Sequence, residues 1–199
     1  MYIAVEGVDG TGKTTLVTNL SDRLRAKISP SDNTMVQTVY EPYELFGTID
    51  ADYLESLNPW GLACLYHADR LDLLDKRILP ALAEGRWVIS DRSVYSTLAY
   101  QGTGTRGSDP VELDLYFEMS RTSMLAWPAL VLYLELPKGH ARIEEPAGDY
   151  DMDKVADAYL NLITEDPEQF RVIKVSDLTE EEVTNHAWDW LVKRFPELQ

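Results

Sequence analysis

Residues 7–14 read Gly7-Val8-Asp9-Gly10-Thr11-Gly12-Lys13-Thr14, and this segment fits the pattern G-x-x-x-x-G-K-[ST] of a phosphate-binding loop. A short strand-like run, residues 2–6, precedes the loop. Apolar residues at helical spacing follow it, namely Leu16, Leu20 and Leu24. The order of strand, glycine loop and helix predicts a site for a nucleoside triphosphate, and the alternative is a chance glycine-rich turn.

The residue types of this loop suit phosphate binding. Glycines let the backbone bend so that successive N–H groups point at anionic oxygens. A helix that begins near Lys13 adds its positive N-terminal dipole. We expect Lys13 to bridge the β- and γ-phosphates and the Thr14 hydroxyl to bind Mg²⁺. The predicted nucleotide-binding set is Gly7, Val8, Asp9, Gly10, Thr11, Gly12, Lys13, Thr14 and Thr15.

Composition narrows the class of protein. The 199 residues are 45% hydrophobic, which suits one domain spanning residues 1–199. We expect no signal peptide, and because no run of ~20 apolar residues occurs, we also expect no membrane partner. The single cysteine, Cys64, cannot form an internal disulfide, and a cytoplasmic location is the simple expectation. The net charge of −16 argues against nucleic acid as a partner and is typical of either high-salt adaptation or a viral origin.

Strand-like and helical patterns alternate along the chain. Strands are predicted at residues 2–6, 35–40, 87–90, 130–136 and 171–175. Helices are predicted at residues 13–26, 59–83, 94–100, 111–125, 153–164 and 179–194. This order predicts an α/β fold with a mostly parallel five-stranded sheet and helices on both faces. Ligands in such folds bind beyond the carboxyl ends of the strands, so the residues that follow each strand are candidates for the site.

Charged side chains follow two of these strands. Asp91 ends the third strand, where a carboxylate would hold Mg²⁺ or its water, and Arg92 beside it would grip a phosphate. Glu41 follows the second strand. Without the glycine loop, Asp91 and Arg92 would indicate only a helix cap and a surface cation.

Two helices present residues suited to a nucleotide base. Tyr66 and Arg70 lie four residues apart, which places an aromatic ring beside a guanidinium. For Tyr66, packing in the core is the alternative to stacking on a ligand. On the next helix, one face carries polar side chains close to Ser96, namely Thr97, Tyr100 and Gln101.

At this point the chain resembles the thymidylate kinase family of P-loop nucleoside monophosphate kinases. Residues 5–15 are similar to the phosphate-loop opening of that family, and Ala68-Asp69-Arg70 to its base-reading helix. Residues 84–92 and 96–102 resemble its central signature, and residues 170–175 fit its C-terminal strand. The similarity extends best over residues 1–136, and the order of the segments is more specific than any one of them.

The resemblance implies transfer of the ATP γ-phosphate to dTMP, with Lys13, Asp91, Arg92 and Arg142 in catalytic roles. By position, Asp9 would contact the 3′-hydroxyl of the acceptor sugar, and Arg92 would hold its phosphate. Tyr66 would stack on thymine, Arg70 and Gln101 would hydrogen-bond the base, and Tyr100 would crowd the 2′ side. The implied acceptor-site set is Asp9, Glu41, Tyr66, Arg70, Arg92, Ser96, Thr97, Tyr100 and Gln101. The resemblance also implies a homodimer, for which residues 62–74 are a candidate surface, with core packing as the alternative.

The chain departs from the family pattern in its cations. The arginine expected beside the proline after the second strand is absent, because the neighbours are Tyr40, Glu41 and Tyr43. The lid, at residues 138–150, is short and acidic, and Arg142 is the arginine available in it. Arg106 is a candidate replacement, and a surface position is the alternative for Arg142.

These gaps leave other functions open. A kinase for a 5-modified dUMP would use the same base contacts, and a deoxynucleoside kinase would need fewer phosphate cations. A non-catalytic nucleotide-binding regulator is a third possibility.

Overall fold

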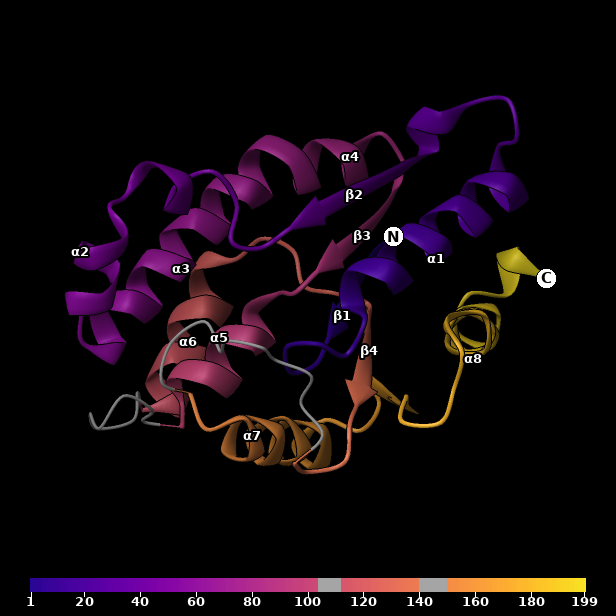
Figure 1. The fold of residues 1–199 in the computed structure, drawn as a ribbon. Coiled ribbons are helices and arrows are strands. Elements are labelled where there is room, and N and C mark those ends of the chain that lie inside the picture. Colours follow the sequence, from indigo (N-terminus) through magenta and orange to yellow (C-terminus); the bar gives the residue numbers. More distant parts are fainter. Residues whose placement is uncertain (104–111, 140–149) are drawn as a thin grey trace.

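A computed structural model describes residues 1–103, 112–139 and 150–199, and it shows five parallel strands flanked by helices (Figure 1). The strand order across the sheet is β2-β3-β1-β4-β5. Ile3 of the central strand pairs with Ile89 on one side and Leu130 on the other. The strands are β1 (Tyr2–Glu6), β2 (Val36–Tyr40), β3 (Trp87–Asp91), β4 (Leu130–Glu135) and β5 (Phe170–Lys174). The predicted α/β fold with a parallel sheet is confirmed.

Local signals place the ends of several helices. Asn58 accepts a hydrogen bond from the Gly61 N–H at the start of α3, and Thr179 forms a capping box with Glu182 at the start of α8. The α-helices are α1 (Lys13–Ile28), α2 (Ala51–Ser56), α3 (Pro59–Leu73), α4 (Leu79–Ala83), α5 (Val94–Gln101), α6 (Leu113–Ser123), α7 (Met152–Glu165) and α8 (Glu180–Arg194). Short 3₁₀ turns occupy Asn33–Met35, Phe46–Thr48 and Pro196–Leu198.

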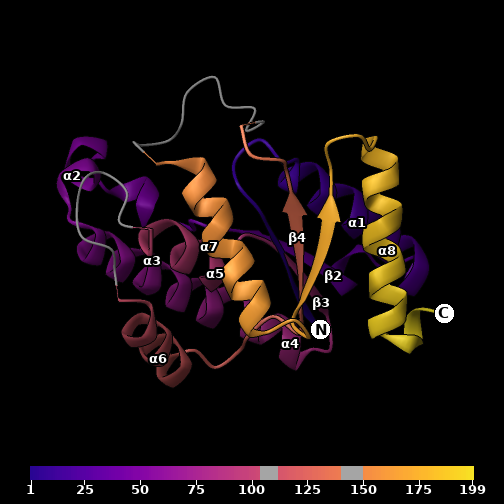
Figure 2. The same cartoon turned by 90° about the horizontal axis from the view of Figure 1, so that it is seen from below.

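The helices cover both faces of the sheet (Figure 2). Helices α1 and α8 pack on one face, and α3, α5 and α7 lie on the other. The alternation of side chains along β1 matches this arrangement. Ile3 and Val5 belong to the core on the face that α1 and α8 cover, and Tyr2 and Ala4 belong to the core on the opposite face. Both faces of the central strand are therefore buried, as its apolar sequence requires.

One predicted helix differs in the structure. Residues 59–83 were expected to form a single helix, but a π-helical turn, Leu74–Ile78, separates α3 from α4. Pro80 explains the interruption, because it lacks an N–H and its ring conflicts with the carbonyl of Lys76 in a regular α-helix. The other predicted ends differ by one or two residues.

Residues 62–74 belong mainly to the core of this chain. Leu62, Leu73 and Leu74 are buried, whereas Cys64 is exposed. The described helices include none that is long and apolar enough to cross a membrane.

Candidate active site

The phosphate-binding loop connects β1 to α1 at the carboxyl edge of the sheet. Gly7 has a φ of 148°, and a Cβ there would lie 2.7 Å from the Leu134 carbonyl oxygen, so a larger residue does not fit. The Lys13 ammonium donates to the Val8 carbonyl at 2.9 Å and lies 3.7 Å from Asp9 Oδ1. Burial, followed by repulsion from Arg92, lowers the pKa of Lys13 to about 8.

The two residues predicted to bind Mg²⁺ are in contact. Thr14 Oγ1 donates a 2.6 Å hydrogen bond to Asp91 Oδ2, so a hydroxyl and a carboxylate meet beside the loop. Both are the oxygen ligands that Mg²⁺ prefers. The described residues contain no group of three histidine, cysteine or carboxylate side chains that could hold a metal by themselves. A metal ion here would therefore need phosphate and water as its further ligands.

Arg92 lies between the phosphate loop and α5. Its backbone is left-handed, with a φ of 74°, and its amide donates to the Val5 carbonyl at 2.9 Å. The guanidinium forms an ion pair with Asp9, donates to Ser96 Oγ at 3.2 Å, and lies 5.1 Å from the centre of the Tyr100 ring. This arrangement places a fixed cation within reach of the loop.

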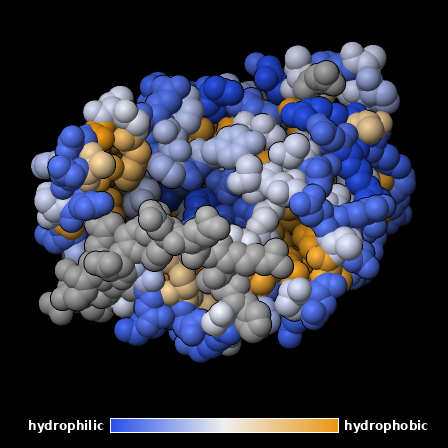
Figure 3. All heavy atoms as spheres, viewed as in Figure 1, coloured by the Kyte–Doolittle hydropathy of each residue, from blue (hydrophilic) through white to orange (hydrophobic). Residues whose placement is uncertain are grey.

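Two hollows meet at Asp9, Glu41 and Arg92, and the surface in the middle of this face is hydrophilic (Figure 3). The first, of about 530 Å³, lies over the phosphate loop and includes Lys13 and Asp91. The second, of about 440 Å³, is lined by Pro42, Tyr150 and the nine predicted acceptor residues: Asp9, Glu41, Tyr66, Arg70, Arg92, Ser96, Thr97, Tyr100 and Gln101. The structure thus brings together residues from five separate parts of the sequence.

Arg70 makes the most hydrogen bonds of the described side chains that line the second hollow. Its guanidinium is buried and pairs with Glu41 through Nε and Nη2, the shortest contact being 2.6 Å. Nη2 also donates to Thr97 Oγ1, and Nη1 donates to the Tyr116 hydroxyl, both at 2.9 Å. Because a guanidinium carries five N–H groups, Nη1 retains one N–H beyond these bonds. The sequence did not predict Tyr116 as a partner or the pairing with Glu41.

Gln101 presents a different polarity to the same hollow. Its Nε2 donates to the Tyr150 hydroxyl at 2.9 Å, and its Oε1 is buried with no hydrogen-bond partner among the described residues. Tyr150 packs edge-on against Tyr100, with the ring centres 5.3 Å apart. Sequence reasoning missed Tyr150, because it follows a segment without helical or strand periodicity. Gln101 therefore has an acceptor oxygen at the hollow.

Tyr66 is partly buried and stacks on Phe46, with ring centres 4.3 Å apart and planes inclined by 22°. Phe46 does not line the second hollow, whereas Tyr66 does. Tyr66 therefore packs on an aromatic neighbour and also lines the hollow, and its stacking on a ligand stays a prediction.

A smaller hollow, of about 140 Å³, continues from the phosphate loop toward α8. It shares Gly10, Gly12 and Thr15 with the hollow over the loop, and its walls combine polar groups with the side chains of Leu136, Val175, Leu178 and Val183. The sequence analysis did not assign these residues, although Leu136 and Val175 directly follow β4 and β5, at the same edge of the sheet.

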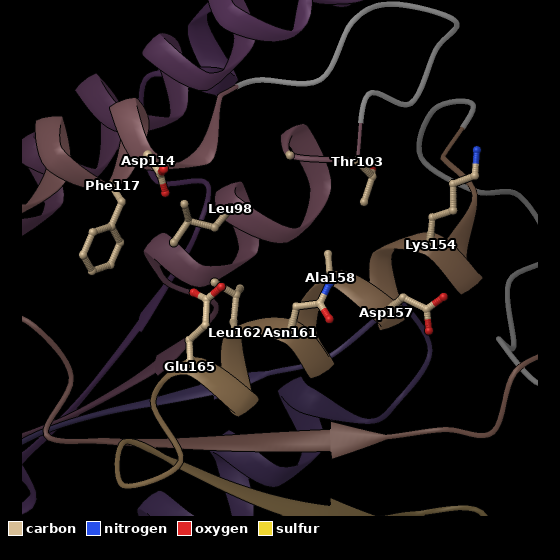
Figure 4. Close-up of a pocket in the computed structure, with 11 residues that line it drawn as sticks. Leu98, Thr103, Asp114, Phe117, Lys154, Asp157, Ala158, Asn161, Leu162 and Glu165 are labelled. Carbon is tan, nitrogen blue, oxygen red and sulfur yellow. The ribbon is translucent and has the colours of Figure 1, made fainter.

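A further hollow, of about 580 Å³, lies apart from this site between α5, α6 and α7 (Figure 4). Leu98, Phe117 and Leu162 line it together with Asp157 and Glu165, and no residue of the phosphate loop takes part. Arg142 and Arg106, the remaining candidate cations, and most of the predicted lid at 138–150 lie outside the described residues.

Comparisons with known proteins agree with this geometry. A family model described as "Thymidylate kinase" matches residues 5–186. The chain is 33% identical to a thymidylate kinase of Bifidobacterium longum, over 90% of this chain and 92% of that one. It is also 33% identical to a thymidylate kinase of Lacticaseibacillus casei, over 99% and 97% of the two chains.

Solved structures show the same fold. A thymidylate kinase of Ehrlichia chaffeensis superposes with a TM-score of 0.78 at 23% identity, covering 96% of this chain and 98% of that one. A thymidylate kinase of Candida albicans gives a TM-score of 0.74 at 23% identity, covering 96% and 91%. The family model and the relatives agree with the phosphate loop and the second hollow, and this chain belongs to the thymidylate kinase family.

Proposed function

We propose that the protein transfers the γ-phosphate of ATP to dTMP and releases dTDP and ADP. The observation that carries this proposal is the meeting of two hollows at Asp9, Glu41 and Arg92. One hollow is built on a phosphate-binding loop and suits a triphosphate donor. The other is lined by aromatic, amide and guanidinium groups that suit a nucleoside monophosphate. The names of the relatives support the same reaction.

On the donor side, Lys13 and the backbone N–H groups of the loop would hold the phosphates of ATP. Thr14 Oγ1 and Asp91 Oδ2 lie 2.6 Å apart and fit a Mg²⁺ ion, with Asp91 binding it directly or through a water. When bound, Mg²⁺ supplies positive charge to the transferring phosphate. The smaller hollow, in which Leu136 and Val175 can pack on a planar ring, would take the adenine base.

On the acceptor side, Arg92 would bind the phosphate of dTMP, and Tyr66 would stack on the base. The single N–H left on Arg70 Nη1 suits the 4-carbonyl of thymine, and the unpartnered Gln101 Oε1 suits its N3–H. Cytosine presents the opposite polarity at both positions. The pair of groups therefore favours thymine or uracil over cytosine.

The transfer itself needs position and charge neutralisation. An oxygen of the dTMP phosphate attacks the γ-phosphorus and forms a new P–O bond. The bond between that phosphorus and the β–γ bridging oxygen breaks, and ADP leaves with the electron pair. Arg92 lies where the two hollows meet, so it can hold the acceptor phosphate in line with the donor held by Lys13.

An ADP-release assay with a panel of acceptors tests the function. We expect dTMP to be the best acceptor, 5-substituted dUMP analogues to react more slowly, and dCMP to react at least ~10-fold more slowly because both base contacts are mismatched. Lys13→Ala is the control that removes donor binding. Phosphorylation of thymidine without phosphorylation of dTMP would contradict the proposal and establish a nucleoside kinase. ATP binding without turnover of any acceptor would indicate a regulator.

We also propose a homodimer. Exposed apolar side chains on and after α6 support this assembly, namely Leu115, Phe117 and Leu125. Sedimentation equilibrium tests it, and Leu115→Glu is expected to give monomers if the α6 surface forms the interface.

A further inference from the structure

Glu6 is a buried carboxylate at the end of β1, directly before the phosphate loop. Its side chain is fully shielded from solvent. Oε1 accepts a 2.6 Å hydrogen bond from Ser93, and Oε2 accepts from Ser96 at 2.6 Å and from the Tyr159 hydroxyl at 2.8 Å. Burial raises the pKa of Glu6, and the three hydroxyl donors oppose this change. All three partners donate, so they match an ionised carboxylate.

The hydrogen bonds of Glu6 extend to Arg92 in one step. Ser96 Oγ accepts from Arg92 Nη1 at 3.2 Å and donates to Glu6 Oε2. Ser93, the residue after Arg92, is held by the other oxygen of the same carboxylate. The two serines therefore connect both the backbone and the guanidinium of Arg92 to one buried anion.

The turn that carries Arg92 needs such support. A φ of 74° is unfavourable for a residue with a Cβ, and it persists where the surroundings fix it. The Val5–Arg92 backbone bond and the two serines bound to Glu6 are contacts that do so. A glutamine at position 6 would fill the same space without a charge. What the carboxylate adds is the greater strength of hydrogen bonds to an ionised acceptor.

We propose that Glu6 is a positioning residue for the acceptor phosphate, acting through Ser93 and Ser96 to hold the Arg92 guanidinium where the two hollows meet. The inference rests on the proposed function, because it takes Arg92 as the group that binds the phosphate of dTMP. Glu6 lies outside both hollows, so it touches neither substrate.

Calorimetric binding of dTMP and of thymidine to wild type and Glu6→Gln tests the proposal. We expect the Kd of dTMP to rise about 10-fold, as for the loss of one charge-assisted contact, and the Kd of thymidine to change less than twofold. Thymidine lacks the phosphate and therefore reports general damage to the hollow. An equal loss of both ligands, or no loss of dTMP affinity, overturns the proposal.

Two further variants separate the route through Ser96 from simple packing. Ser96→Ala breaks the connection between Arg92 and Glu6, so the double variant with Glu6→Gln should lose less dTMP affinity than the sum of the two single losses. Tyr159→Phe is the matched comparison, because it removes a hydroxyl that bonds to the same carboxylate oxygen and to Ser96 Oγ at 3.0 Å but keeps the bonds that join Ser96 to Arg92 and Glu6. Its dTMP affinity should fall less than that of Glu6→Gln. Additive losses, or a Tyr159→Phe effect as large as that of Glu6→Gln, contradict the proposal.

If Glu6→Gln does not fold, Ser93→Ala and Ser96→Ala carry the same comparison of dTMP with thymidine. The binding measurement also separates a failure of this proposal from a failure of the proposed function. Wild-type protein that binds dTMP tightly but releases no ADP would overturn the proposed function alone. Wild-type protein that binds dTMP no better than thymidine would overturn both.

Discussion

Lys13 is an ammonium with little access to water. Its exposed fraction is 7%, and its nearest oxygens are the Val8 carbonyl and Asp9 Oδ1. Burial and the neighbouring Arg92 lower its pKa to about 8, although Asp9 and Asp91 favour the charged form. The free protein therefore begins to lose this positive charge at mildly alkaline pH, where an exposed lysine would stay charged.

This pKa predicts a pH dependence of ATP use. We expect kcat/KM for ATP to fall as pH rises above about 8, because neutral Lys13 no longer attracts the phosphates. Bound phosphates favour the ammonium, so kcat at saturating ATP should fall only at higher pH. Steady-state rates between pH 6.5 and 9.5 measure both quantities. A kcat/KM that stays constant to pH 9.5 would show that Lys13 keeps its proton in the free protein.

At the scale of elements, α3 and α6 meet through a neutral histidine. His67 Nε2 lies 2.8 Å from Ser123 Oγ, and the ring packs edge-on against Tyr116 at 5.8 Å. Burial, followed by the charge of Arg70, lowers the pKa of His67 to about 4. The part of this contact that His67 makes therefore depends on an uncharged ring, beside the hydrogen bond from Arg70 to Tyr116.

We predict that the low pKa of His67 reduces the free energy of unfolding in acid. Below pH 6.5 the unfolded chain binds a proton at His67, while the folded chain does so only near pH 4, so the free energy of unfolding falls across this interval. The loss is about 1–3 kcal/mol, since a tenfold change in proton affinity corresponds to ~1.4 kcal/mol. Urea unfolding at pH 7.5 and 5.0 measures it.

His67→Gln should lose less stability than wild type between those two pH values. His186→Gln, at an exposed position on α8, should lose as much as wild type and serves as the matched control. Equal losses in all three proteins would mean that His67 does not contribute.

The elements differ in how far the sequence predicts them. The phosphate loop and the central strands can be predicted from local patterns. The spacing of Gly7 and Lys13 indicates the loop, and the short apolar runs indicate the strands. The pairing of Arg70 with Glu41 spans 29 positions, and Tyr150, the last residue of the predicted lid, bonds to Gln101 from 49 positions away, so no local period indicates either contact. No role for Glu6 was predicted, since the hydroxyls that bind it come from Ser93, from Ser96 on α5 and from Tyr159 on α7.

At the scale of the whole molecule, the charge of the site differs from that of the protein. In the described part of the site, Lys13, Arg70 and Arg92 are balanced by the carboxylates Asp9, Glu41 and Asp91. The net charge of −16 therefore dominates the field that an approaching nucleotide meets. Anionic substrates are repelled at long range and attracted only by groups inside the hollows.

We predict that kcat/KM for dTMP rises with ionic strength at constant Mg²⁺. The Debye length falls from ~30 Å at 0.01 M to ~8 Å at 0.15 M, which screens the long-range repulsion more than the buried contacts. Rates in 10–150 mM NaCl measure the effect, and thymidine binding should not change, because thymidine is uncharged. A kcat/KM that decreases with added salt would show that local cations dominate.

Under the proposed function, the left-handed backbone at Arg92 sets the strain of its turn against the binding of the acceptor phosphate. Glycine adopts a φ of 74° without the steric cost of about 1–2 kcal/mol that a side chain brings. A glycine at position 92 relaxes the turn and at the same time removes the guanidinium from the junction of the two hollows. If Arg92 binds the acceptor phosphate as proposed, the residue that relaxes this turn and the residue that supports turnover are different, so arginine at position 92 reflects selection for turnover.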